Sequence, residues 1–118
     1  PLEVEVLEAS DSTARVRWQH FQLTEGLSLC EYRVMVCQLP TAEEDRESAL
    51  WDDRTSHVAG IFTSRVSDED VEYQVRGLMA DMFYVVRVDA RYPFVGERGW
   101  SEPAMTREPL HTCYALRP

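Results

Sequence analysis

The stretch GLMADMFYVVRVDA, residues 77–90, decides the fold class of this 118-residue chain. In its second half every other residue is apolar: Tyr84, Val86, Val88 and Ala90. The residues between them include charged side chains, which favour contact with water. This period of two is typical of a β-strand that buries one face. The stretch therefore predicts a strand over about residues 84–91, with its apolar face turned into a core.

Shorter runs with the same period occur along the rest of the chain. They predict further strands near residues 2–8, 14–18, 32–36, 57–65, 71–75 and 101–108. Turn-forming residues separate the runs, and no long helical pattern or internal repeat is present. Seven short strands without helices predict an all-β, two-sheet antiparallel sandwich. Large apolar area in its core would come from four aromatic residues: Trp18, Tyr32, Tyr73 and Tyr84.

The alternation stops between about residues 39 and 56. This insertion holds an acidic run over residues 43–47 and then Trp51, Asp52 and Asp53. We expect a long connection here after the third strand, with a helical turn near residues 42–50. The whole chain is the size of one domain, so we expect a domain over residues 1–108 and a C-terminal linker over residues 109–118.

The charge balance restricts the class of partner. The chain has 12 basic and 21 acidic residues and a formal net charge of −9. Nucleic acid and anionic membrane surfaces would be repelled by most of such a surface. No apolar run is long enough to enter a bilayer. The expected partners are therefore other proteins or neighbouring domains of the same chain.

Three cysteines, Cys30, Cys37 and Cys113, cannot form a closed set of disulfides. Cys30 and Cys37 are an odd number of residues apart, so they face opposite sides of one strand and cannot bridge. Three thiols would suit a reducing compartment, whereas one bond to Cys113 would suit a secreted protein. Intracellular and extracellular locations remain equal expectations.

The sequence contains no pattern that predicts catalysis. It has no His-Glu-x-x-His, no Cys-x-x-Cys, no Gly-x-Ser-x-Gly and no phosphate-binding glycine loop. The acidic residues Asp68, Asp70 and Glu72 lack the spacing of a calcium loop and are interpreted as a solvated turn. We therefore expect no enzymatic activity, no cofactor and no metal site.

Residues 77–90 also resemble a fibronectin type III domain. The family has Gly-Leu, then a Tyr six residues after the Leu, then small or branched apolar residues at every second position, as here. Ala80 stands where Pro is usual, and Met82 where Thr is usual. Trp18 and Tyr32 fit the pattern too, and the resemblance covers about residues 1–108. It implies an immunoglobulin-like sandwich in which the Tyr84 hydroxyl bonds the backbone near residues 77–79, Leu78 closes one end and Trp18 fills the centre.

A second stretch is similar to the membrane-proximal domain of class I cytokine receptors. Arg87 and Arg91 alternate on the outer face of a strand, and Gly99-Trp100-Ser101-Glu102-Pro103 follows the next loop. In those receptors strand arginines stack on tryptophans of a Trp-Ser-x-Trp-Ser box, of which this chain has one Trp-Ser pair. The alternative interpretation is that these residues begin an ordinary final strand.

Two surfaces are candidates for protein binding. The first is Trp51 with Asp52 and Asp53: the ring either anchors a basic partner or folds back over the edge of the sheet. The second is the outer face of the sixth strand, together with the tryptophan that follows it: Phe83, Val85, Arg87, Arg91 and Trp100. Phe83 and Val85 either meet a partner or a neighbouring domain, or are covered by the insertion.

These observations favour a non-catalytic protein-interaction or spacer module of a larger multidomain protein. Such a module works by display, because a rigid sandwich holds loops and one sheet face for another protein. Two alternatives remain. One is a ligand-binding or structural module of a cytokine-receptor-like ectodomain, and the other is an accessory domain of a multidomain enzyme.

Overall fold

The computed structural model describes residues 3–21, 29–41, 51–65, 69–91 and 100–114. The described chain forms eight β-strands and one short 3-10 turn, η1, over Asp53–Thr55. The strands are β1 (Glu3–Ala9), β2 (Ala14–Trp18), β3 (Leu29–Gln38), β4 (Ser56–Arg65), β5 (Val71–Val75), β6 (Phe83–Arg91), β7 (Ala104–Thr106) and β8 (Leu110–His111). Thus the structure is all-β, as the alternation predicts.

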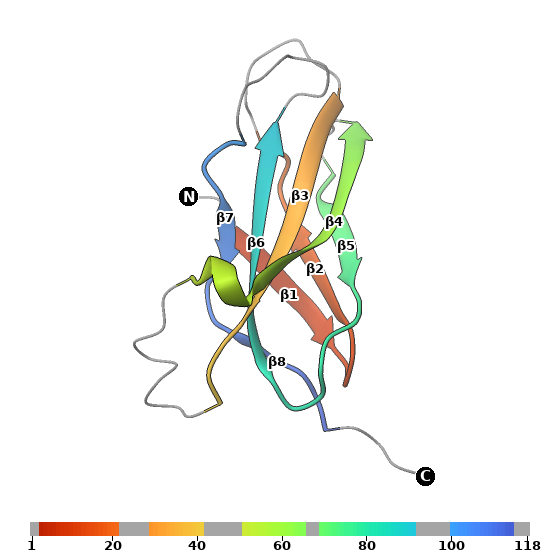
Figure 1. Cartoon of the computed structure of the whole chain (residues 1–118). Helices are drawn as coiled ribbons and strands as arrows, with labels where there is room; N and C mark the ends of the chain where they lie inside the picture. The colour runs from red at the N-terminus through yellow and green to blue at the C-terminus, as the bar shows by residue number, and fades with distance from the viewer. Residues whose placement is uncertain (1–2, 22–28, 42–50, 66–68, 92–99, 115–118) are drawn as a thin grey trace.

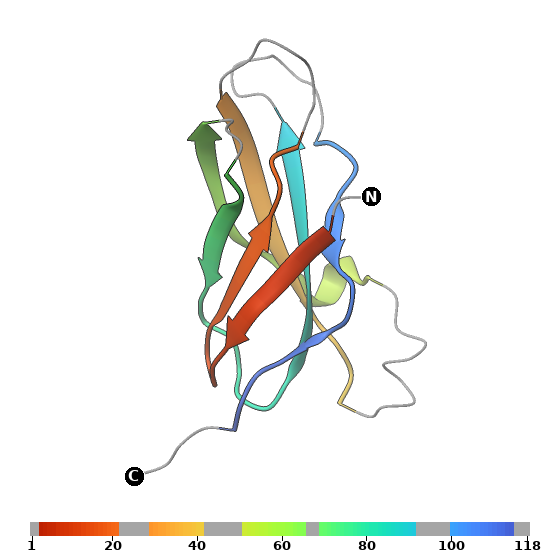
Figure 2. The same ribbon diagram turned by 180° about the vertical axis from the view of Figure 1, so that it is seen from behind.

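The strands form two facing layers (Figures 1 and 2). One layer has the order β4-β3-β6-β7, with β8 beside β6, and the other has the order β1-β2-β5. Strand β1 belongs to both: Glu3 and Val4 pair in parallel with β7, and the rest of the strand pairs antiparallel with β2. A register shift between Val6 and Glu8 follows on β1. Since bulges bend strands, this shift accompanies the passage of β1 from one layer to the other.

Aromatic side chains fill the space between the layers. Trp18 has a relative exposure of 2%, and its indole meets the ring of Tyr32 edge-on at a centroid distance of 5.4 Å. Phe62 packs against both of these rings, and Phe21 packs against the ring of Tyr32. The alternating valines of β3 and β6 complete this core. The apolar residues at every second position of β3 and β6 are therefore buried, as the sequence predicts, because each strand turns one face inward.

The backbone bond expected of Tyr84 is confirmed. The amide of Met79 donates to the Tyr84 hydroxyl at 2.8 Å. Leu78 is buried, and its amide donates to the carbonyl of Ser12 at 2.9 Å, which ties the approach to β6 to the turn after β1. Gly77 has a φ of 74°, a left-handed conformation that glycine adopts without a steric penalty. These contacts close one end of the sandwich.

The structure corrects three details of the expected sandwich. The described residues already form eight strands where seven were expected in the whole chain, and the pairing of β1 with β7 is parallel. The third is the C-terminal boundary, expected at residue 108. Leu110 is buried in β8, and the Thr112 hydroxyl donates to the Met79 carbonyl at 2.6 Å. The packed part of the chain therefore extends past residue 108.

Tyr73 lies at the margin of the core rather than inside it. Its half-buried ring stacks on Phe62 at a centroid distance of 5.2 Å, and its hydroxyl donates to the carbonyl of Ala59 on β4 at 3.1 Å. The acidic run of the insertion and the helical turn expected near residues 42–50 lie outside the described residues.

We predict that Trp18→Ala lowers the free energy of unfolding by about 3–5 kcal/mol, because it leaves a large cavity between the layers. Urea unfolding followed by circular dichroism measures the loss. Trp51→Ala is the matched control, since that ring lies outside the core. An equal, small effect of both substitutions would contradict the placement of Trp18 at the centre of the core.

Candidate protein-interaction face

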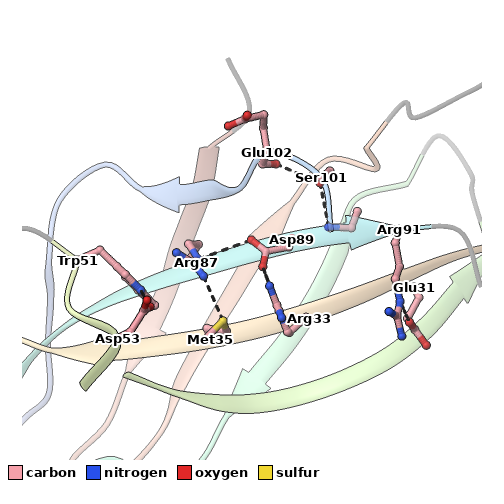
Figure 3. A network of polar contacts seen from close by, with 11 residues as sticks. Glu31, Arg33, Met35, Trp51, Asp53, Arg87, Asp89, Arg91, Ser101 and Glu102 are labelled. Atoms are coloured by element: carbon pink, nitrogen blue, oxygen red, sulfur yellow. Dashed lines mark hydrogen bonds and ion pairs between the residues drawn. The ribbon is translucent and has the colours of Figure 1, made fainter. Parts of the chain in front are cut away.

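The outer face of β3 and β6 carries a connected row of charged and aromatic side chains. We call it the arginine–tryptophan ladder; its members, in spatial order, are Trp51, Arg87, Asp89, Arg33, Trp100, Arg91 and Glu31. The antiparallel register creates it, because Glu31 pairs with Arg91, Arg33 with Asp89, and Met35 with Arg87. Figure 3 shows how most of these side chains lie along the two strands.

Asp89 is the centre of the ladder. Its relative exposure is only 2%, although it points to the outer side of the sheet. Arg33 donates to its Oδ2 from Nε at 3.0 Å and also from Nη2. On the other side, Arg87 Nε lies 3.6 Å from Oδ1, an ion-pair distance rather than a hydrogen bond. A buried carboxylate is costly unless cations and donors compensate it, and two guanidinium groups do so here.

Two indole rings cover the guanidinium groups. The Cζ atoms of Arg33 and Arg91 lie 4.6 Å and 4.3 Å from the centroid of the Trp100 ring. The Cζ of Arg87 lies 4.4 Å from the centroid of the Trp51 ring. Each distance is in the range of a cation–π contact. Arg91 also pairs with Glu31. The two ends of the ladder are therefore fixed as well as its centre.

The segment that brings Trp51 to the ladder is itself held in place. Asp52 caps η1 by accepting from the Arg54 amide at 2.9 Å, and this bond holds the pKa of Asp52 below its ordinary value. Asp53 accepts from the Trp51 indole at 2.8 Å. Below the segment, Cys37 Sγ lies 3.3 Å from the Thr55 hydroxyl. Both acids thus serve local structure, and the cation that meets Trp51 is Arg87 of the same chain.

Phe83 and Val85 have different surroundings among the described residues, and contact of either with a partner or with the insertion stays a prediction. Phe83 stacks on His111 of β8, with ring centroids 4.1 Å apart and an interplanar angle of 8°. Val85 lies half-buried farther along β6. Because β8 provides the cover for Phe83, that ring is not an open apolar surface. The predicted members of the second surface thus separate into the ladder residues, Phe83 beside β8, and Val85 farther along β6.

Open apolar surface occurs instead on β4, next to the ladder. Val58 and Ile61 have relative exposures of 48% and 54%. Their partners on β3 are Met35 and Arg33, which face outward, so both residues lie on the outer face. Ala59 is an extra residue opposite the Val34–Met35 step, and this bulge keeps both side chains on that face. Sequence analysis did not identify these two residues.

Part of the ladder was predictable and part was not. The alternation identified Arg87 and Arg91 as outward-facing, and the cytokine-receptor resemblance associated them with Trp100. Arg33 and Glu31 were missed, although they occupy the polar positions of an alternating strand. The burial of Asp89 could not be predicted, because it depends on Arg33 of β3, which is distant in sequence, as well as on Arg87.

The described residues contain no group of three or more His, Cys, Asp or Glu side chains placed to hold a metal ion. None of their segments is a helix long and apolar enough to cross a membrane. A groove of about 710 Å³ runs along β1 and the segment from β7 to β8; its lining includes Val4, Arg17, Glu108 and Leu110. It is separate from the ladder.

His20 lies where β2 leads into the next loop. Its Nδ1 is 2.8 Å from the hydroxyl of Tyr32. Burial lowers the pKa of His20, while the negative charge of Asp70 opposes that effect. Burial also raises the pKa of Tyr32 and of Cys30, so both stay neutral near pH 7.

Comparison with known proteins supports the fold. No family model matches the chain, and no curated protein matches it. The crystal structure of domains A168-A170 from titin matches with 25% identity and a TM-score of 0.61, over 96% of this chain and 32% of the titin chain. The sensor domain of the anti-sigma factor RsgI4 of Pseudobacteroides cellulosolvens, solved in solution, matches with 12% identity and a TM-score of 0.58, over 97% of this chain and 75% of that one.

A computer-based redesign of a β-sandwich protein also matches, with 17% identity and a TM-score of 0.50, over 97% of this chain and 94% of the other. The chain thus spans about a third of the titin chain and most of the other two. These likenesses and the two facing layers establish an immunoglobulin-like β-sandwich, consistent with a non-catalytic binding or structural module.

We predict that Asp89→Asn destabilises the domain by about 2–4 kcal/mol, because two half-buried guanidinium groups lose their counter-ion. Urea unfolding measures the change. Asp53→Asn, at an exposed carboxylate, is the control and should cost about 0–1 kcal/mol. Equal effects of the two substitutions would show that Asp89 does not compensate buried charge.

We also predict that His20 makes the domain less stable in mild acid. A lowered pKa in the folded state means that the unfolded chain binds the proton more tightly. The stabilisation is present above the unfolded pKa of about 6.5 and is lost as the pH falls below it. Unfolding free energies at about pH 7.5 and about pH 5.5 should therefore differ more in the wild type than in His20→Gln. The same difference in both proteins would contradict this assignment.

Proposed function

We propose that the chain is a fibronectin type III-type interaction module of a larger multidomain protein. In this proposal the module binds another protein through the outer face of the β4-β3-β6-β7 layer. The arrangement of side chains on this face supports the proposal: the fixed ladder lies in the middle, and exposed apolar side chains lie beside it on β4. A surface of this kind needs little ordering when a partner arrives, which reduces the entropic cost of binding.

The observation that carries the proposal is that a fixed set of charged side chains, the ladder, lies beside exposed apolar side chains on the same face. The ladder places three guanidinium groups against two carboxylates on a chain whose net charge is −9. This face is therefore much less acidic than the chain as a whole, so a protein partner meets less repulsion there than elsewhere. Val58 and Ile61 add apolar area that a partner can cover.

The likeness to titin supports a multidomain context. The matched titin chain contains several domains, A168 to A170, of which this chain spans about one third. A fibronectin type III-type domain in such an array would act as a spacer as well as a binding surface. The arrangement of Tyr84, Leu78 and Gly77 supports this subclass of sandwich, because it matches the family pattern at the corner before β6.

A receptor ectodomain module is the second candidate. The contacts of Arg33 and Arg91 with Trp100 favour it, since stacked arginines and tryptophan are the feature that the resemblance implied. The two candidates are separated by counting the reactive thiols of the protein after it is purified from its source cells and unfolded without a reductant. Three free thiols favour a reducing compartment, and a disulfide at Cys113 favours the receptor.

Affinity capture with matched variants tests the outer face. We predict that proteins retained by the wild type from an extract of the source cells fall at least about tenfold with Ile61→Glu, because a buried charge opposes docking. Gln74→Glu places the same new charge on the outer face of the other layer and is the control. Equal recovery with all three proteins would contradict binding through this face and leave the spacer role.

A further inference from the structure

The margin of the candidate face is an edge strand. Within the part of the chain that the structure describes, β4 pairs with β3 on one side and with no strand on the other. Figure 1 shows β4 at the outer limit of its layer. An edge strand directs the amide and carbonyl groups of every second residue away from the sheet, where another chain can bind them. At ten residues, β4 is twice as long as β5, the edge strand of the other layer.

Among the residues that the structure describes, protection of this edge is confined to its first half. The bulge at Ala59 interrupts the regular pairing there, and the Tyr73 hydroxyl donates to the Ala59 carbonyl. The close approach of Tyr73 depends on Gly60, since a Cβ at that position would lie 2.0 Å from the hydroxyl. Beyond Gly60 the strand has regular register through Arg65 and contains no proline, aspartate, glutamate or lysine, residues that commonly block edges.

The second half of β4 also has a defined side-chain pattern. Ile61, Thr63 and Arg65 pair with Arg33, Glu31 and Leu29 on β3, so they follow one another on the outer face. An added strand would place its own alternate side chains beside these three. Ile61 presents apolar surface, Thr63 is a β-branched neighbour, and Arg65 is a cation at the end of the row.

Local charge selects the partner. Arg65 is exposed and has no carboxylate within ion-pair distance among the described residues. The neighbouring carboxylate on this face, Glu31, is already paired with Arg91. Charges farther away than about 8 Å are largely screened at physiological ionic strength. Arg65 is therefore available to pair with a carboxylate of a partner.

We propose that residues 60–65 of β4 accept an extended segment of a partner protein as an additional strand. The segment carries β-branched apolar side chains beside Ile61 and Thr63 and a carboxylate beside Arg65. The inference rests on the proposed function, and it specifies which side chains the partner of that face carries. Backbone hydrogen bonds supply the pairing, and the side chains on the outer face supply the selectivity.

A second copy of the chain fits this edge less well. Two copies pairing antiparallel over residues 61–65 would place Arg65 beside Ile61 of the other copy, so neither arginine would gain a counter-ion. Both copies also carry a net charge of −9. Repulsion between them opposes self-association.

Synthetic peptides test the proposal directly. The probes are two heptapeptides: Thr-Val-Thr-Val-Thr-Glu-Thr, which places its glutamate beside Arg65 in a parallel pairing, and Thr-Glu-Thr-Val-Thr-Val-Thr, which does so in an antiparallel pairing. Each is titrated into the isotope-labelled domain and followed by NMR. We expect amide shift changes concentrated on β4 and slower hydrogen exchange at its edge. The lysine analogue of the tighter-binding peptide should bind about tenfold more weakly than that peptide. Arg65→Glu should reverse this preference, whereas Arg15→Glu, the matched change on β2, should leave it intact.

N-methylation separates strand addition from simple side-chain contact. Alternate residues of a strand direct their amides to opposite edges. Methylating the backbone amides of the two valines and the glutamate should therefore have a very different effect from methylating those of the threonines. One of the two sets should abolish binding, and the other should leave it intact. Equal effects of the two sets would overturn strand addition.

Three further results would also overturn the proposal. They are absent shift changes on β4, equal affinity for the acidic and lysine peptides, and sedimentation showing a dimer that Ile61→Glu dissolves. A different result would separate failure of this inference from failure of the proposed function. If the peptides fail but Ile61→Glu still removes captured proteins, the outer face binds a partner without adding a strand.

Discussion

The burial of a single carboxylate organises the outer side of this sandwich. Asp89 has almost no contact with water, and its charge is compensated by Arg33 from the neighbouring strand and by Arg87 from its own. Those guanidinium groups in turn lie against Trp100 and Trp51. Because each member is fixed by the next, the side chains of two strands and two loop segments form one connected surface.

This arrangement changes the role of the two exposed-looking tryptophans. Loop tryptophans are common binding anchors, and the sequence leaves that interpretation open for Trp51 and Trp100 beside a structural role for each ring. In the structure each ring already contacts an arginine of the same chain. The rings therefore contribute mainly to the stiffness of the face, while open apolar surface is provided by Val58 and Ile61 on β4.

Prediction from sequence worked where the signal was local. The alternation along β6 specified a strand, its inward residues and its outward arginines. The resemblance of residues 77–90 to a fibronectin type III domain implied the hydrogen bond of Tyr84 at the corner. Prediction worked less well where the outcome depended on contacts distant in sequence. The addition of β8, the cover that His111 gives Phe83 and the burial of Asp89 each require residues from separate strands to meet. A period-two pattern within one strand does not predict which residues of other strands that strand contacts.

The exposed residues of β4 illustrate the same limit. A regular strand that alternates in and out would turn Val58 and Ile61 to opposite faces, because they are an odd number of residues apart. The bulge at Ala59 places both on the outer face. A one-residue insertion in the pairing is set by the neighbouring strand and by the contact of Tyr73 with Gly60, so it is not visible in the sequence of β4.

The central claim is that the ladder forms a rigid face, and NMR relaxation of the Trp100 indole N–H tests it most directly. The account predicts an order parameter near that of well-ordered backbone, about 0.85. A value below about 0.6 would show that the ring moves freely over the sheet. That result would contradict a fixed arginine–tryptophan surface.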